Sequence, residues 1–139
     1  MNRLLVASAA LLTLNACIVY SSDTAPAPIN ASPQITWAES GCFWDNAAYD
    51  WVWYFDADVT DPDGLGDVWE VYADVFDEYT GQLVDSFLLS DYGGGYWSTE
   101  WLQYQTYLDC SYGWYVVDFV AYDYYDAVDT YAVYPYQSW

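Results

Sequence analysis

Five aspartates crowd the segment from residue 56 to residue 67, and their spacing suggests a site for a metal cation. Calcium prefers carboxylate and other oxygen ligands on a loop that glycine allows to turn sharply. The run Asp61-Pro62-Asp63-Gly64-Leu65-Gly66-Asp67 offers carboxylates around two glycines, although it does not match the EF-hand loop. Asp-Pro-Asp-Gly is equally a good turn without a metal, so both interpretations stay open. The candidate calcium ligands are Asp58, Asp61, Asp63 and Asp67.

A second acidic turn spans residues 123–126. In a sandwich of two sheets it would lie at the same end as the first acidic turn or at the opposite end. The sequence does not decide between these two arrangements.

The side chains that the chain lacks disfavour catalysis. It has no His, and its only Lys or Arg is Arg3. Imidazole bases, lysine Schiff bases and cationic oxyanion stabilisers are therefore missing. A pair of carboxylates, as in glycosidases, is the catalytic scheme that remains, but no Glu lies in a recognisable motif. We therefore predict that the protein is not an enzyme and requires no cofactor, with Ca²⁺ as the one candidate ion.

The formal net charge of −20 limits the class of partner. Nucleic-acid recognition depends on Lys and Arg contacts to phosphate, which this chain cannot supply. The acidic surface is either a solubilising coat or a surface that attracts cations. We predict no nucleic-acid partner.

Alternation of apolar and polar residues with a period of two dominates the chain from residue 34 onwards, which indicates strands. Turn sequences such as Asp61-Pro62-Asp63-Gly64 and Gly93-Gly94-Gly95 separate the alternating segments. About seven short strands emerge, as an all-β Greek-key sandwich requires. They are expected at residues 35–38, 51–59, 69–75, 83–89, 96–102, 115–121 and 127–134.

Aromatic residues make up 22% of the chain and fall on both phases of these strands. Trp51, Trp53, Trp69 and Tyr115 occupy the inward phase and are expected in the core. Tyr54, Tyr72, Trp114 and Tyr122 occupy the outward phase. Outward aromatics either stabilise the sheet as cross-strand pairs or form a platform for sugar rings, as in carbohydrate-binding modules.

Two motifs carry a resemblance to a fold family. The segment Gly113-x-Tyr115-x-Val117-x-Phe119-x-Ala121-x-Asp123 resembles the penultimate strand of immunoglobulin-like and cadherin-like domains of bacterial surface proteins. Val59-Thr60-Asp61-Pro62-Asp63-Gly64 resembles the turn after their second strand. The resemblance implies an immunoglobulin-like sandwich and a tyrosine corner, in which the Tyr115 hydroxyl bonds back to the main chain. It implies no single function.

The N-terminal segment has the features of an export signal. Arg3 precedes an apolar run, residues 4–14, that is too short to cross a bilayer as a helix. Leu14-Asn15-Ala16-Cys17 resembles the lipobox of bacterial lipoproteins, which implies cleavage before Cys17 and acylation of that cysteine, with palmitate among the acyl groups. An ordinary secretory signal with an incidental Cys17 is the alternative. Ile18, rather than Asp, after the cysteine favours the outer over the inner membrane.

With Cys17 assigned to the anchor, Cys42 and Cys110 remain. The space outside the cytoplasm is oxidising, so a Cys42–Cys110 disulfide is expected. The alternative, two thiols that bind a metal, lacks a third thiol or a His.

These features predict three regions: a lipoprotein signal peptide at 1–16, a lipidated tether at 17–33, and an acidic β-sandwich at 34–139. The predicted function is a lipid-anchored, non-catalytic binding or structural module of the bacterial cell envelope, of the adhesion type. A carbohydrate-binding module is the alternative. The partners expected are membrane lipid, through Cys17, and a protein or glycan that the sequence does not identify.

Overall fold

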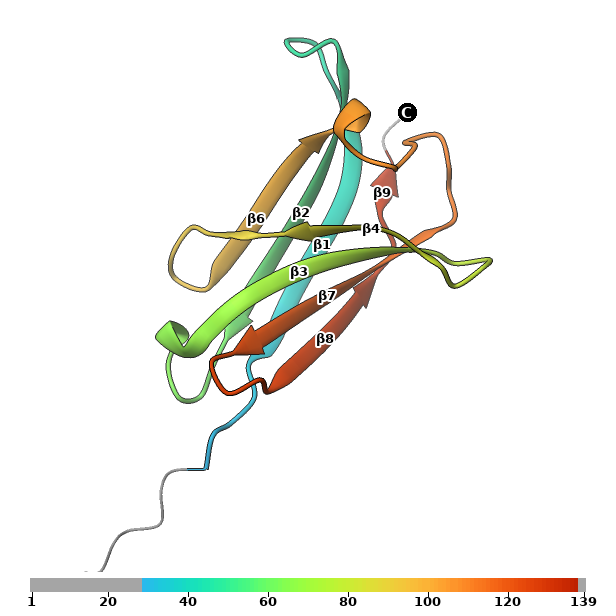
Figure 1. Ribbon diagram of the computed structural model, residues 1–139. Coiled ribbons are helices and arrows are strands. Elements are labelled where there is room, and N and C mark those ends of the chain that lie inside the picture. The colour runs from blue at the N-terminus through green and yellow to red at the C-terminus, as the bar shows by residue number, and fades with distance from the viewer. Residues whose placement is uncertain (1–28, 138–139) are drawn as a thin grey trace, which may run out of the picture.

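The computed structural model describes residues 29–137, which form two β-sheets packed face to face (Figure 1). The predicted leader, Cys17 and most of the predicted tether lie outside the described residues. Within residues 29–137 there are nine strands and two short 3₁₀ turns, η1 (Leu65–Asp67) and η2 (Gln103–Gln105). The all-β sandwich predicted from the sequence is confirmed. None of the helical segments in this part of the chain has the length and apolarity needed to cross a membrane.

Sheet A has the strand order β5-β6-β2-β1-β9. Its centre is the long antiparallel pair of β1 and β2, and β9 adds to β1 in parallel. Its strands are β1 (Gln34–Asp45), β2 (Asp50–Thr60), β5 (Ser90–Asp91), β6 (Tyr96–Leu102) and β9 (Tyr136–Gln137).

Sheet B has the order β4-β3-β7-β8, and all its pairs are antiparallel. Its strands are β3 (Val68–Asp77), β4 (Leu83–Leu88), β7 (Tyr115–Asp123) and β8 (Val128–Val133). The chain enters at the lower end of Figure 1, where the β2–β3 and β7–β8 turns also lie. The β1–β2 hairpin lies at the opposite end.

The core fills the space between the sheets with alternate residues of each strand. Phe55 of sheet A is fully buried and stacks on Phe87 of sheet B, with ring centroids 4.7 Å apart. Trp53, Val71, Val75 and Phe119 are equally inaccessible. Because each strand contributes its inward phase to one apolar layer, the period-two pattern fixes which face is buried.

Two details of the strand prediction are wrong. The first strand was expected at residues 35–38 but continues to Asp45, because β2 pairs with it over its whole length. Trp69 was expected in the core but is 52% exposed. A β-bulge between Val68 and Glu70 shifts the register there, so that Val68 takes the inward position and Trp69 points outwards.

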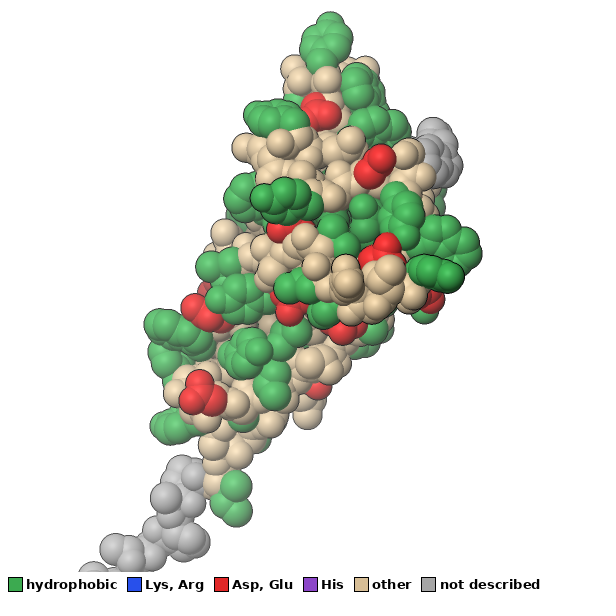
Figure 2. All heavy atoms as spheres, turned by 45° about the vertical axis from the view of Figure 1, so that its right-hand side comes forward, with side chains coloured by type: hydrophobic (Ala, Val, Ile, Leu, Met, Phe, Trp, Pro, Cys, Tyr) green, Lys and Arg blue, Asp and Glu red, His purple; other side chains and the backbone are tan. Residues whose placement is uncertain are grey.

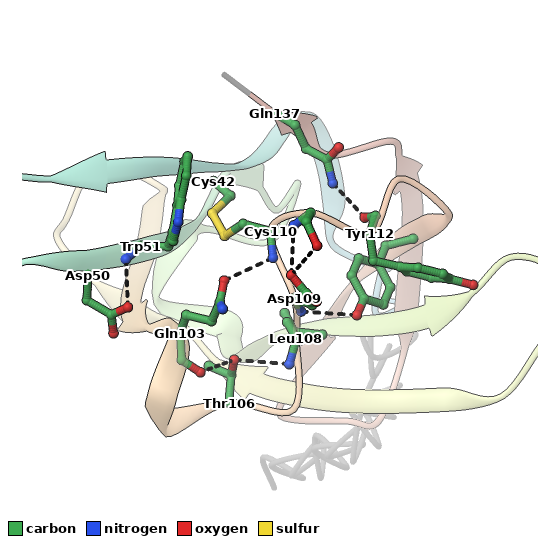
Figure 3. Close-up of a disulfide and its surroundings, with 12 residues drawn as sticks. Cys42, Asp50, Trp51, Gln103, Thr106, Leu108, Asp109, Cys110, Tyr112 and Gln137 are labelled. Atoms are coloured by element: carbon green, nitrogen blue, oxygen red, sulfur yellow. Dashed lines mark hydrogen bonds between the residues drawn. A yellow bond between two sulfur atoms is a disulfide. The ribbon is translucent and has the colours of Figure 1, made fainter. Parts of the chain in front are cut away.

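The disulfide between Cys42 and Cys110 is present, as predicted, with Cα atoms 5.9 Å apart. It joins β1 to the loop between β6 and β7, at the end of the sandwich opposite the chain entry (Figures 1 and 3). The Gln103 side chain accepts a hydrogen bond from the Cys110 main-chain N–H at 3.0 Å. The Tyr115 hydroxyl accepts one from the Asp109 N–H at 3.2 Å, the main-chain contact expected of it. These bonds fix the loop around the disulfide.

A hydrogen bond from the Tyr112 hydroxyl to Asp77 Oδ2, 2.6 Å long, closes the same end of the molecule. This bond, followed by burial, raises the pKa of Tyr112 to about 12. The bond from Tyr112, followed by the main-chain N–H of Thr80, lowers the pKa of Asp77. The pair therefore stabilises the fold while Asp77 is charged and Tyr112 is neutral.

We expect this bond to contribute stability between about pH 4 and pH 10, the unfolded pKa values of Asp and Tyr. The Asp77 contribution is lost as the pH falls from about 4 through the lowered pKa, and the Tyr112 contribution is lost as the pH rises from about 10 towards 12. Urea unfolding from pH 2 to pH 12 should show the largest stability difference between the native chain and Tyr112→Phe inside this window, with the difference shrinking progressively beyond both ends. Tyr107→Phe, at an exposed position, is the control. A difference independent of pH would contradict the assignment.

Candidate metal centre

The segment between β2 and β3 brings three aspartates together at the end where the chain enters the sandwich. Asp61 follows the last residue of β2, and Asp67 closes η1 just before β3 begins. One carboxylate oxygen from each of Asp61, Asp63 and Asp67 lies within 4.8 Å of the other two. Oxygens that bind one Ca²⁺ at about 2.3–2.6 Å lie at most about 5 Å apart, so these three atoms can share one ion.

Main-chain hydrogen bonds fold the loop so that the carboxylates converge. Asp61 Oδ1 accepts the Asp63 N–H at 2.7 Å, and the Asp61 carbonyl accepts the Gly64 N–H at 3.0 Å. Gly64 has a φ of 122°, which residues with a Cβ rarely adopt. Its carbonyl accepts the Asp67 N–H at 2.9 Å, which forms η1. The Asp-Pro-Asp-Gly turn is therefore the element that positions the cluster.

Asp61 holds a carboxylate oxygen that has no partner. The residue is 9% exposed, and its Oδ2 atom is buried without a hydrogen-bond donor among the residues that the structure describes. A buried polar atom left unsatisfied costs about 1–3 kcal/mol. A turn alone needs only Oδ1, so the turn does not account for Oδ2. A cation does.

The negative charges around Asp67 also favour a bound cation. Burial, followed by the charges of Asp61, Asp123 and Asp63, raises the pKa of Asp67. Nothing in the sequence after Arg3 carries a positive side chain that could relieve this repulsion. The loop therefore gathers negative charge that no side chain of the sequence after Arg3 can neutralise.

Asp123, at the end of β7, lies beside this cluster and was not among the predicted ligands. The structure settles the open position of the second acidic turn, because the Tyr124 N–H donates to the Asp67 carbonyl at 3.1 Å. Burial opposes ionisation of Asp123, but hydrogen bonds from Asn30, Ala127 and Tyr125 outweigh it and lower the pKa. Its oxygens already accept these bonds, so Asp123 adds charge rather than a free ligand.

The residues that lead into β1, at the end of the predicted tether, are attached at this candidate centre. Asn30 Nδ2 donates to Asp123 Oδ2 at 2.6 Å, and the Ala31 N–H donates to Asp63 Oδ2 at 2.7 Å. The candidate metal centre therefore lies at the junction between the entering chain and the sandwich.

Asp58, the fourth predicted ligand, lies apart from the cluster. It is exposed on β2, where its main chain pairs with Trp37 and Tyr96. Two residues, Val59 and Thr60, separate it from Asp61. Val59 is buried in the core, so the Asp58 side chain points to the outer face of sheet A. It serves below as a control position.

The four aromatics of the predicted platform do not share one face. Tyr72 and Tyr122 meet edge to face on the outer side of sheet B, with centroids 6.3 Å apart. Tyr54 lies on sheet A, where its hydroxyl donates to Glu39 Oε1 at 2.9 Å. Trp114 precedes β7 and is 61% exposed near Glu78. The structure thus brings together two of the four residues.

Comparison of the chain with protein-family models, with curated proteins and with solved structures found no match.

Proposed function

We propose that the chain is a lipid-anchored, non-catalytic binding or structural module of the bacterial cell envelope, with an immunoglobulin-like sandwich stabilised by calcium. The ion binds at Asp61, Asp63 and Asp67. The observation that carries the calcium site is the buried, unpartnered Oδ2 atom of Asp61 inside a group of three converging carboxylates. The lack of His and of Lys supports the non-catalytic part.

Calcium fits this loop better than magnesium does. Magnesium requires near-ideal octahedral geometry and binds through one or two carboxylates while it keeps several waters. Calcium accepts irregular sets of six to eight oxygens, about what three carboxylates, loop carbonyls and water supply. The exposure of Asp63 leaves room for that water.

The position of the site suggests what the ion does. Asp63 also holds the Ala31 main chain, and Asp123 holds Asn30. An ion that orders Asp63 therefore also orders the point at Asn30 and Ala31 where the chain enters the domain. In an anchored protein, this point sets how the sandwich is held relative to the membrane.

We expect calcium to raise the melting temperature of the mature chain, residues 17–139 with Cys17→Ser. A ligand that binds only the folded state, at a hundredfold excess over its Kd, adds about 2.7 kcal/mol, which is about 10 °C for a domain of this size. Calorimetry in chelator, in millimolar calcium and in millimolar magnesium measures the shift. Equal small shifts with both ions would mean charge screening and would contradict a specific site.

The variant Asp67→Asn gives two effects of opposite sign. In chelator it should melt higher than the native chain, because it removes a charge that Asp61, Asp123 and Asp63 repel. In calcium it should lose most of the stabilisation, because it removes a ligand. The matched control is Asp58→Asn, which removes the same charge outside the cluster and should keep the full calcium shift. A calcium shift that survives in Asp67→Asn would contradict the site.

A further inference from the structure

The outer face of sheet B carries an open hollow of about 450 Å³. Aromatic rings and carboxylates form most of its lining. The residues concerned are Trp69, Glu70, Tyr72 and Asp74 of β3, Tyr122 of β7 and Asp126 of the β7–β8 turn, and Ser86 of β4 completes the lining. This volume is in the range of pockets that bind small organic molecules.

Two of the three aromatic rings of the hollow are exposed, and neighbouring rings pack against them. Tyr72 and Tyr122 stand edge to face with an interplanar angle of 84°. The β-bulge turns Trp69 out of the core, and its ring packs at 4.8 Å against Tyr124. These contacts leave ring faces available to solvent, because Trp69 is 52% and Tyr122 is 36% exposed.

The carboxylates of the hollow have already taken up the nearby hydroxyl donors. The Tyr72 hydroxyl donates to Glu70 Oε2 at 2.8 Å, and Ser86 Oγ donates to Asp74 Oδ1 at 2.6 Å. The other oxygens of these two carboxylates accept no hydrogen bond from residues 29–137 and can accept from a ligand. The hollow therefore presents acceptors and negative charge.

The negative charge continues beside the hollow. Asp118 of β7 is the direct cross-strand partner of Asp74, so both side chains project from the same face. Like charges at such positions destabilise a sheet. Figure 2 shows the general pattern on one side of the molecule, with acidic groups set among aromatic and apolar ones and no basic group. A cation bound at the hollow would remove this repulsion.

We propose that this hollow binds a linear aliphatic polyamine. The ammonium groups of such a molecule donate hydrogen bonds to Glu70, Asp74 and Asp126, and its methylene segments lie over the rings. A cation within about 6 Å of an aromatic face gains a further attraction from the ring. A neutral sugar would stack on the same rings but leave the carboxylates uncompensated, and the −20 charge of the chain repels an anion. The site is separate from the calcium cluster and does not depend on the proposed function.

The test is isothermal titration of the mature Cys17→Ser chain with spermidine, in saturating calcium and in about 0.15 M salt, which screens diffuse attraction. We expect saturable binding at one site. Asp74→Asn should weaken it up to about fivefold, because an ion pair near the protein surface contributes at most about 1 kcal/mol. Trp69→Leu should weaken it as well. Thermal melts show whether each variant is folded.

The matched control is Asp56→Asn on the outer face of sheet A. Asp56, like Asp74, accepts a hydroxyl hydrogen bond, in its case from Tyr96 at 2.8 Å. The Asp56→Asn variant should leave the affinity for spermidine unchanged. Equal losses in Asp74→Asn and Asp56→Asn, or no saturable binding, would overturn the proposal.

Two further measurements separate the alternatives. A titration in chelator that responds to Asp61→Asn but not to Asp74→Asn would place the amine at the calcium cluster and overturn the proposal. Binding of an N-acetylglucosamine disaccharide that Trp69→Leu abolishes and Asp74→Asn leaves intact would make the hollow a glycan platform instead.

Discussion

Replacing Cys42 and Cys110 together by Ala lowers the free energy of unfolding of the domain by about 4 kcal/mol. The disulfide joins residues 68 positions apart, and the loss of conformational entropy that a cross-link of this length imposes on the unfolded chain gives this magnitude. The melting temperature should fall by about 15 °C. Because the bridge holds the loop between β6 and β7 against β1, this loop should become the first region to exchange its amide hydrogens.

Urea unfolding of the oxidised chain, the reduced chain and the double variant measures the effect. The reduced chain and the double variant should agree within about 1 kcal/mol, since both lack the cross-link. Thiol titration of the unfolded, unreduced mature Cys17→Ser chain is the control and should find no reactive sulfur. Two reactive thiols, or a double variant as stable as the native chain, would contradict the predicted contribution.

The strands could be predicted because their signal is local. Trp53, Phe55, Ala57 and Val59 alternate with polar residues, and all four are buried in β2. The two additional strands, β5 and β9, are two residues long and have no periodicity to read. They form because the neighbouring edges of β6 and β1 offer main-chain partners. A sequence pattern carries no information on such an edge.

Trp69 is the position at which the period-two pattern of β3 predicts the wrong burial. The apolar alternation through Val71, Ala73 and Val75 extends naturally to Trp69, yet the bulge inverts the phase by one residue. Val68 then enters the core at 8% exposure. Both residues are apolar, so hydropathy gives no reason to prefer one. The register of β3 against β7 decides which of these two residues is buried. It therefore also decides whether Trp69 lines the hollow.

The candidate metal centre was predictable in its ligands and not in its surroundings. Asp61, Asp63 and Asp67 lie within seven residues, so local turn chemistry brings them together. Asp123 is far away in sequence, and only the pairing of β3 with β7 places it beside Asp67. Asp58 lies outside the group of three carboxylates, because the alternation of β2 turns its side chain to the outer face.

The acidic composition and the two candidate sites are connected. A chain whose only basic side chain is Arg3 has no means of pairing its carboxylates internally. The described residues instead use hydroxyl and main-chain donors, as Asp74 does with Ser86 and Asp123 with Tyr125. At Asp61 Oδ2 and around the hollow, the described residues supply too few such donors. Negative charge remains there that a cation can neutralise.

Expressed with its N-terminal segment in a bacterial host, the protein should sediment with the membranes, and Cys17→Ser should release it into the soluble fraction. Each buried CH₂ of an acyl chain adds about 0.8 kcal/mol of membrane affinity, so two or three chains give a stable anchor where one gives a marginal one. The acidic domain adds no attraction to anionic lipid. The expected change is therefore nearly complete, from membrane-bound to soluble.

The matched control is the double variant Cys42→Ala and Cys110→Ala, which removes two cysteines but keeps Cys17 and should remain with the membranes. Mass spectrometry of the native protein should find acyl groups on an N-terminal Cys17 and no trace of residues 1–16. Salt washing should not extract the protein, because the proposed anchor depends on acyl chains rather than on charges. A soluble native protein with a free Cys17 thiol would show an ordinary secretory signal, and the role of the Asn30 and Ala31 contacts in holding the domain relative to a membrane would then fall with the anchor.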